Sequence, residues 1–275
     1  MLHRAVYSGC YPPLKLLTNT AMNFGMEISA VVIITLCIFL FASFIHGCIA
    51  FGFPMVATPL LSLFTDIQTA IFLTLIPTVL VNLVSIYSEG GLPNAFRRHF
   101  LLALFAMLGS AIGTQILLVV HSEVFKLLLA STIIYYLFSE KIKLNFSWVS
   151  QFPRLSKVVF GVSAGVLGGL TNVMAPVLII YSLESKHSKE DIIQASNLCF
   201  LFGKMIQLVL FISNGKYISD QFMLSNMGLF VSSSGLFAGI TIKKNIRLPV
   251  YTKILRVLLF IISISLFVQG TIIFV

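Results

Sequence analysis

One lysine lies where a charge is costly. Lys204 is near the middle of the run 192–212, which is long enough to cross a bilayer and contains no other charged residue. A cation at membrane depth costs roughly 2.5 kcal/mol or more on insertion scales, and such residues usually mark a pathway or a site. All nine acidic residues fall at the ends of the apolar runs or between them, so we expect Lys204 to be the only full charge buried in those runs. Its natural counter-charge is then an anion that binds and leaves. The alternative is a side chain that snorkels or bonds carbonyls at a helix break, and the central position argues against snorkelling.

Other polar side chains in the predicted spans are candidates to join Lys204. Asn197 lies seven residues before it and Gln207 three residues after, so all three can share one helix face. His46 is the only histidine in a predicted span, and a proton carried there near neutral pH would couple anion movement to the proton gradient. For each of these residues, an ordinary interhelical hydrogen bond of about 1 kcal/mol is at least as good an explanation.

Two segments rich in glycine and proline interrupt the apolar runs. The first contains Gly52-Phe53-Pro54, and the second contains Gly168-Gly169-Leu170-Thr171-Asn172. Breaks of this kind free backbone groups, which a membrane tolerates only where protein or a water-filled cavity satisfies them. Half-helices that start at Pro54 or Thr171 would direct N–H groups and positive dipole ends at the bilayer centre, and would form an anion site without an arginine. The alternative is close helix packing, which explains Gly161, Gly165 and Gly169 but explains the two breaks poorly.

Composition defines the class of protein. The chain is 58% hydrophobic and 10% charged, with a mean hydropathy of +1.01, so we expect an all-α polytopic membrane protein. The net charge of +9 comes from short loops between apolar runs, which is typical of cytoplasmic loops and argues against nucleic acid as a partner. The four cysteines have no metal-binding spacing, and we expect neither a metal nor a cofactor.

The chain divides into two similar halves. We expect an N-terminal leader at 1–26, a first transmembrane repeat at 27–139, a cytoplasmic linker at 140–157 and a second transmembrane repeat at 158–275. Aligning 57–61 with 174–178 gives an offset of 117 residues, and later elements align at 125 to 127, which pairs Asn82 with Gln207. Such duplication is typical of transporters whose binding site lies at the repeat interface.

The distribution of basic residues predicts the topology. If each repeat start crosses the membrane once, eight crossings leave the Lys and Arg residues evenly divided between the two sides. If 158–183 instead enters and leaves on one side, the N-terminus, 89–99, 140–157, 184–191 and 243–256 share a side with 15 of the 18 basic residues. This arrangement inverts the second repeat relative to the first. We therefore expect seven to eight transmembrane helices, two inverted repeats, and a broken or re-entrant helix at each repeat start.

These features together predict a binding site near mid-membrane between the repeats. Its expected members are Lys204, Thr171, Asn172, Gly168, Gly169, Gly52, Pro54, Asn197, Gln207 and Asn82, with His46 as the candidate for proton coupling.

The glycine-rich entry followed by a proline and an apolar run, present in both halves, resembles the TauE/SafE family of sulfite and organosulfonate exporters. The resemblance extends from about Phe44 to the C-terminus; the first half departs from the usual glycine run, with Phe51-Gly52-Phe53-Pro54 in its place. It implies a permease that moves small sulfur-containing anions across the cytoplasmic (inner) membrane by secondary transport. The partners would be the anion and the lipid bilayer, and a homo-oligomer is left open.

Two other classes of protein fit the sequence less well. A membrane-embedded lipid-phosphate hydrolase needs a positioned acid–base pair, and no carboxylate lies within a predicted span, so we do not expect an enzyme. A cation-coupled transporter of an unrelated substrate usually recruits an intramembrane Asp or Glu, although backbone carbonyls can also bind Na⁺.

Overall fold

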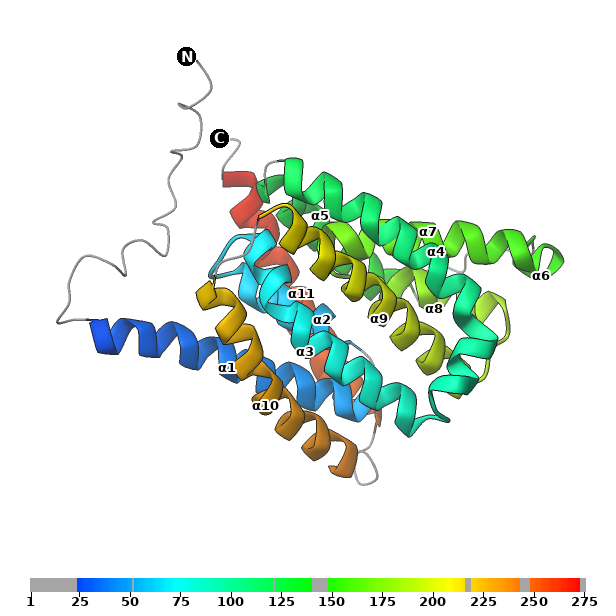
Figure 1. Ribbon diagram of the computed structural model, residues 1–275, viewed down its shortest axis with the longest axis horizontal. Coiled ribbons are helices and arrows are strands. Elements are labelled where there is room, and N and C mark those ends of the chain that lie inside the picture. The colour runs from blue at the N-terminus through cyan, green and yellow to red at the C-terminus, as the bar shows by residue number, and fades with distance from the viewer. Residues whose placement is uncertain are drawn as a thin grey trace, which may run out of the picture.

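The structure is a computed structural model, and it describes residues 24–50, 52–120, 122–139, 148–215, 219–242 and 248–272. All regular elements in these ranges are helices, which confirms the predicted all-α class (Figure 1). Residues 1–23 of the predicted leader and 140–147 of the predicted linker lie outside the described residues. The helices are α1 (Phe24–Ile49), α2 (Phe53–Ser62), α3 (Ile67–Ser88), α4 (Leu92–Val119), α5 (Ser122–Ser139), α6 (Trp148–Gln151), α7 (Pro153–Thr171), α8 (Ala175–Glu184), α9 (Lys189–Ser213), α10 (Ser219–Ile242) and α11 (Leu248–Ile272).

Many of these helices suit a bilayer by length and composition. Among the described residues, five segments are long and apolar enough to cross it: Ala30–Ile49, Ile67–Ser88, Leu92–Val119, Lys189–Ser213 and Gln221–Ile242. Four shorter apolar helices accompany them, in α2, α5, α8 and α11. The chain is therefore an integral membrane protein, and the count of seven to eight crossings stays a prediction.

The first broken segment is a sharp turn between α1 and α2. Ala50 and Gly52 both have left-handed backbones, with φ of 69° and 106°. Helix α2 then begins at Phe53, with Pro54 in its first turn, where a missing N–H costs nothing. The chain reverses direction at this turn. Helix α1 runs parallel to α3, whereas α2 runs back along α3, with Thr58 next to Thr74.

The second broken segment lies between α7 and α8 and differs from the prediction. Asn172 ends α7 with a left-handed φ of 68°, and α8 begins at Ala175, with Pro176 in its first turn. The half-helix therefore starts at Ala175 and not at Thr171. Gly168 and Gly169 belong to the last turn of α7, because a single left-handed residue at Asn172 is enough to end the helix.

Glycines allow two pairs of helices to approach closely. Helix α7 crosses α4 where Gly161, Gly165 and Gly169 face Gly109 and Gly113, and a Cβ added at any of these five would lie within 3.0 Å of the partner helix. Helix α1 crosses α10 in the same way, with Gly47 against Gly239. The packing explanation for these glycines is thus correct, since no side chain fits at either crossing.

Connections gather at two ends of the molecule. At one end Gln194 near the start of α9 reaches Glu89 after α3, and a surface cavity of about 360 Å³ brings Pro153 and Lys157 of α7 next to His187. Helix α7 therefore begins, and α8 ends, at the same end of the molecule, as the basic-residue pattern predicted. At the other end, Gln221 of α10 approaches Thr69 of α3.

The start of α1 overturns one part of the predicted topology. Helices α1, α3 and α10 are parallel. Phe39 and Gly47 of α1 pack on Gly228 and Gly239 of α10, while Gln221 and Ser225 of α10 bond Thr69 and Leu73 of α3. Helix α1 therefore begins at the end opposite to the α3–α4 connection, and the prediction that the N-terminal side is shared with 89–99 is wrong (Figure 1, where α1 begins on the left and α6 lies on the right). The reason is the reversal at Ala50 and Gly52, which an uninterrupted apolar run at 53–64 does not reveal.

Candidate functional site

Lys204 lies at the centre of a polar network formed by both halves of the chain. Its side chain is fully buried in α9, and its Nζ donates to Asn172 Oδ1 and to Gln207 Oε1. Both acceptors are neutral amide oxygens. Among the described residues, the ion pairs include Arg98, His99 and Asp191 but not Lys204. The ammonium is hydrogen-bonded, but no carboxylate in the described part balances its charge.

Asn172 connects this lysine to the other half of the chain. Its Nδ2 donates to Thr58 Oγ1 of α2 at 2.6 Å and to Thr74 Oγ1 of α3 at 2.8 Å. The Thr74 hydroxyl donates a hydrogen bond to the Ile71 carbonyl at 2.8 Å, so its oxygen is free to accept one from Asn172. The two threonines therefore fix the amide with its oxygen directed at Lys204. Sequence reasoning identified Asn172 but missed Thr58 and Thr74, because a threonine in an apolar helix carries no distinguishing signal.

Gln207 connects Lys204 to the end of α7 at the second break. It lies three residues after Lys204 on α9, and its Nε2 donates to the Gly169 carbonyl of α7 at 3.2 Å. Gln207 thus binds the ammonium with its oxygen and a freed helix carbonyl with its nitrogen. The predicted residues Lys204, Asn172, Gln207 and Gly169 do come together.

Helix α9 reaches the first break as well. Asn197 is fully buried, and its Nδ2 donates to the Ala50 carbonyl at 2.7 Å and to the Ile193 carbonyl at 2.8 Å. Its Oδ1 has no hydrogen-bond partner in the part of the chain that the structure describes. Asn197 and Lys204 are seven residues apart, or about 10 Å along a helix, so α9 bridges the two breaks.

His46 closes the α1–α2 turn. Its Nδ1 accepts the backbone N–H of Phe53 at 3.2 Å, and its Nε2 lies 2.8 Å from Ser85 Oγ on α3. A backbone N–H can only donate, so Nδ1 carries no proton in this arrangement and the neutral ring holds its proton on Nε2. A proton-carrying role would require the Phe53 N–H, at the start of α2, to lose this acceptor.

The remaining predicted residues lie apart from the ammonium's hydrogen bonds. Thr171 donates to Leu167 inside α7, Gly168 faces the Met174 side chain, and Pro54 is buried at the start of α2. Gly52 has open space where a Cβ would lie and serves the turn through its left-handed backbone. Asn82 of α3 is fully buried, and neither of its amide atoms has a partner within the described residues.

A second lysine corrects the expectation that Lys204 is the only buried charge. Lys126, in the second turn of α5, is only 2% exposed. Its position near a helix end distinguishes it from Lys204, which lies 15 residues after the start of α9 and nine before its end, and makes it a useful comparison in experiments.

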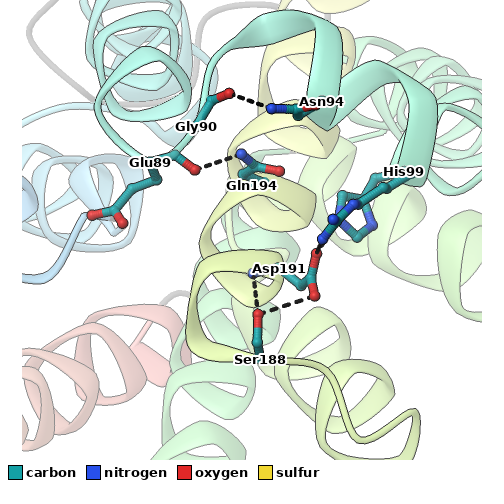
Figure 2. A network of polar contacts seen from close by, with 8 residues as sticks. Glu89, Gly90, Asn94, His99, Ser188, Asp191 and Gln194 are labelled. Carbon is teal, nitrogen blue, oxygen red and sulfur yellow. Dashed lines mark hydrogen bonds and ion pairs between the residues drawn. The ribbon is translucent and has the colours of Figure 1, made fainter.

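A polar network where the α3–α4 and α8–α9 connections meet was not predicted. Asp191 accepts from Arg98 Nη1 at 2.8 Å and from Ser188, and it lies 3.4 Å from His99 Nε2. Figure 2 shows this carboxylate between α4 and the start of α9, with Gln194 donating to the Glu89 carbonyl nearby at 2.5 Å. These contacts tie the α3–α4 connection to the α8–α9 connection. Asp191 is thus bound near the start of α9, far from Lys204 along that helix.

The described residues contain no group of three or more His, Cys, Asp or Glu side chains that could hold a metal ion.

The long apolar helices and the two broken helices define a class of protein, an integral membrane protein with interrupted helices. The sequence model of the family described as "Sulfite exporter TauE/SafE" matches residues 35–266, which is most of the chain. The chain therefore belongs to the TauE/SafE family, as the resemblance predicted. Comparisons with curated proteins and with solved structures returned no match. Since this family consists of transporters, membership does not favour the hydrolase alternative.

Proposed function

We propose that this protein is a secondary transporter that moves small sulfur-containing anions, such as sulfite or sulfonates, across the cytoplasmic membrane, and that it binds them at Lys204. The observation that carries the proposal is a fully buried ammonium whose hydrogen-bond acceptors, among the described residues, are neutral amide oxygens. A buried charge without a counter-charge is costly, and an incoming anion relieves that cost.

The surroundings of Lys204 suit an oxyanion. Helix α8 begins three residues after Asn172, so the positive end of its dipole lies close to the ammonium. Amide and hydroxyl groups of Asn172, Gln207, Thr58 and Thr74 offer hydrogen bonds of either polarity. A small tetrahedral or pyramidal anion with several oxygens can use the charge and these neutral groups together.

We also infer that the two halves are inverted repeats. A separation of 122 residues relates Gly47 to Gly169, left-handed Ala50 to left-handed Asn172, and Pro54 to Pro176. The glycine contacts follow the same relation: Gly47 packs on Gly239, and Gly169 packs on Gly113. At the repeat starts, a separation of 122 residues aligns the two halves better than the 117 residues predicted from sequence. It is closer to the separation of 125 to 127 residues found for the later elements.

Orientation follows from the basic residues. The segments 89–99, 140–157, 184–191 and 243–256 hold 13 of the 18 Lys and Arg residues. Several of their described parts meet at one end of the molecule, and we assign that end to the cytoplasm of a cell with an inner membrane. The start of α1 is then on the opposite side.

Asn172 supports an alternating-access mechanism. Its oxygen binds Lys204 in the second half, and its nitrogen binds Thr58 and Thr74 in the first half. An anion that displaces this oxygen from the ammonium weakens a link between the halves. Substrate binding would in this way favour their relative movement.

The test is replacement of the ammonium. Lys204→Gln should abolish uptake of radiolabelled sulfite or taurine into proteoliposomes, because the remaining groups offer no net charge. Lys126→Gln is the matched control, since it removes another buried lysine and should retain flux. Thermal unfolding of both variants shows whether they fold. Normal flux in a folded Lys204→Gln variant would end the proposal.

A further inference from the structure

We propose that the first break, at the end of α1, binds a sodium ion through Asn82, Asn197 and carbonyl oxygens of the α1 end. The ion would occupy the position that the Lys204 ammonium occupies at the second break. The inference deepens the proposed function and rests on its pairing of the two halves.

The second break shows what such a position requires. Helix α7 ends at Asn172, and the carbonyl end of a helix carries a partial negative charge. The ammonium of Lys204 lies beside that end, bound by the side-chain oxygens of Asn172 and Gln207. Gln207 also covers the Gly169 carbonyl of the same helix. A tethered cation therefore compensates the end of the broken helix.

The first break shares a left-handed residue with the second, but its α3 has no lysine in the position of Lys204. Helix α1 ends beside Ala50, whose φ of 69° matches the 68° of Asn172. Helices α3 and α9 end at Ser88 and Ser213, a separation of 125 residues. The same separation places Val79 in the role of Lys204 and Asn82 in the role of Gln207. A helix end that is compensated in the second half is thus left without a charged partner from α3.

Unpaired oxygens lie on both helices that face this break. Asn197 holds the Ala50 carbonyl with its nitrogen at 2.7 Å, so its oxygen is beside the break, and this oxygen has no partner among the described residues. Asn82 is fully buried, and both of its amide atoms are likewise unpaired there. Buried polar atoms are rarely left unsatisfied, so these oxygens are available to coordinate an ion.

The chemistry of the oxygens selects the ion. Amide and carbonyl oxygens are neutral, and they suit a monovalent cation, whereas Ca²⁺ sites recruit carboxylates. Unwound carbonyls and half-helix C-terminal ends are the groups that bind Na⁺ in transporters with broken helices. His46 does not compete for this role, because both of its ring nitrogens are occupied by Phe53 and Ser85.

The first experiment measures thermal unfolding of the purified protein in sodium chloride and in choline chloride at equal ionic strength. Sodium should raise the melting temperature of the wild type in a saturable way, since a ligand of the folded state stabilises it. Asn82→Leu should lose this increase, and Gln207→Leu, its counterpart at the second break, should keep it. Equal melting temperatures of the wild type in the two salts would overturn the proposal.

The second experiment supplies the missing charge. Val79→Lys places a tethered ammonium at the position that corresponds to Lys204, and anion flux in this variant should no longer depend on sodium. If the variant does not fold, Asn82→Asp serves instead; its carboxylate should lower the sodium concentration that half-saturates the thermal shift. An unchanged half-saturating concentration contradicts the site.

The two proposals fail separately. Lys204→Gln should lose the thermal shift with sulfite but keep the shift with sodium. A protein that keeps its dependence on Lys204 but ignores sodium refutes the cation site alone. A protein that responds to sodium but binds anions equally well without Lys204 refutes the proposed anion site alone.

Discussion

At the scale of single residues, the character of the site depends on which atoms meet the Lys204 ammonium. Two amide oxygens accept hydrogen bonds from it, and they do so with dipoles and not with a full negative charge. A carboxylate at the same distance would bind the ammonium permanently and remove the advantage that an arriving anion gains. Neutral ligands therefore keep the lysine folded into the protein and still available to a substrate.

This reasoning predicts the effect of a nearly isosteric change. Asn172→Asp places a carboxylate where the amide oxygen meets Lys204. It should reduce anion flux at least tenfold, which corresponds to a free-energy difference of about 1.4 kcal/mol. The fold should persist, because the new ion pair keeps the ammonium bonded. Flux in proteoliposomes and thermal unfolding together test this. Asn94→Asp makes the same change at an exposed site and should leave flux unaltered; equal flux in both variants would contradict the role given to Asn172.

At the scale of elements, the two broken helices are formed by different sequence devices. Asn172 ends α7 with a side chain that tolerates a left-handed backbone and also joins the network. The first break uses Ala50, for which this conformation is unfavourable, and it relies on Gly52 and on the bond from Phe53 to His46. The α1–α2 turn therefore depends on a side chain that the α7–α8 turn does not need.

The α1–α2 turn leads to a prediction that separates structure from proton transfer. In His46→Asn the new amide oxygen can accept the Phe53 N–H, but it cannot carry a proton, so flux and its pH dependence should be retained. In His46→Phe the buried N–H loses its acceptor, which should cost about 1–3 kcal/mol of stability. Flux measured from pH 5.5 to 8 and thermal unfolding give the answer. A flat pH profile in a folded His46→Asn variant would instead support proton coupling.

At the scale of the whole molecule, the sequence predicted the class, the family and the residues Lys204, Asn172 and Gln207, since charge and amides in apolar runs are conspicuous. It could not predict that Thr58 and Thr74 hold Asn172, because these contacts join residues 98 and 114 positions apart. It also misplaced the α8 start and the direction of α1. Both errors arise from left-handed residues, whose backbone angles are set by tertiary packing and not by hydropathy.

The corrected direction of α1 gives the last prediction. In a background whose native cysteines are replaced by serine, Ser188→Cys should react with a membrane-impermeant maleimide only from the cytoplasmic side. Asn214→Cys should react only from the other side, because α9 crosses between them. Ala30→Cys, near the start of α1, is exposed and should share the side of Asn214→Cys, since α1 and α10 are parallel. Labelling of Ala30→Cys together with Ser188→Cys would restore the topology expected from charge alone, and it would remove the inverted relation between the two broken helices.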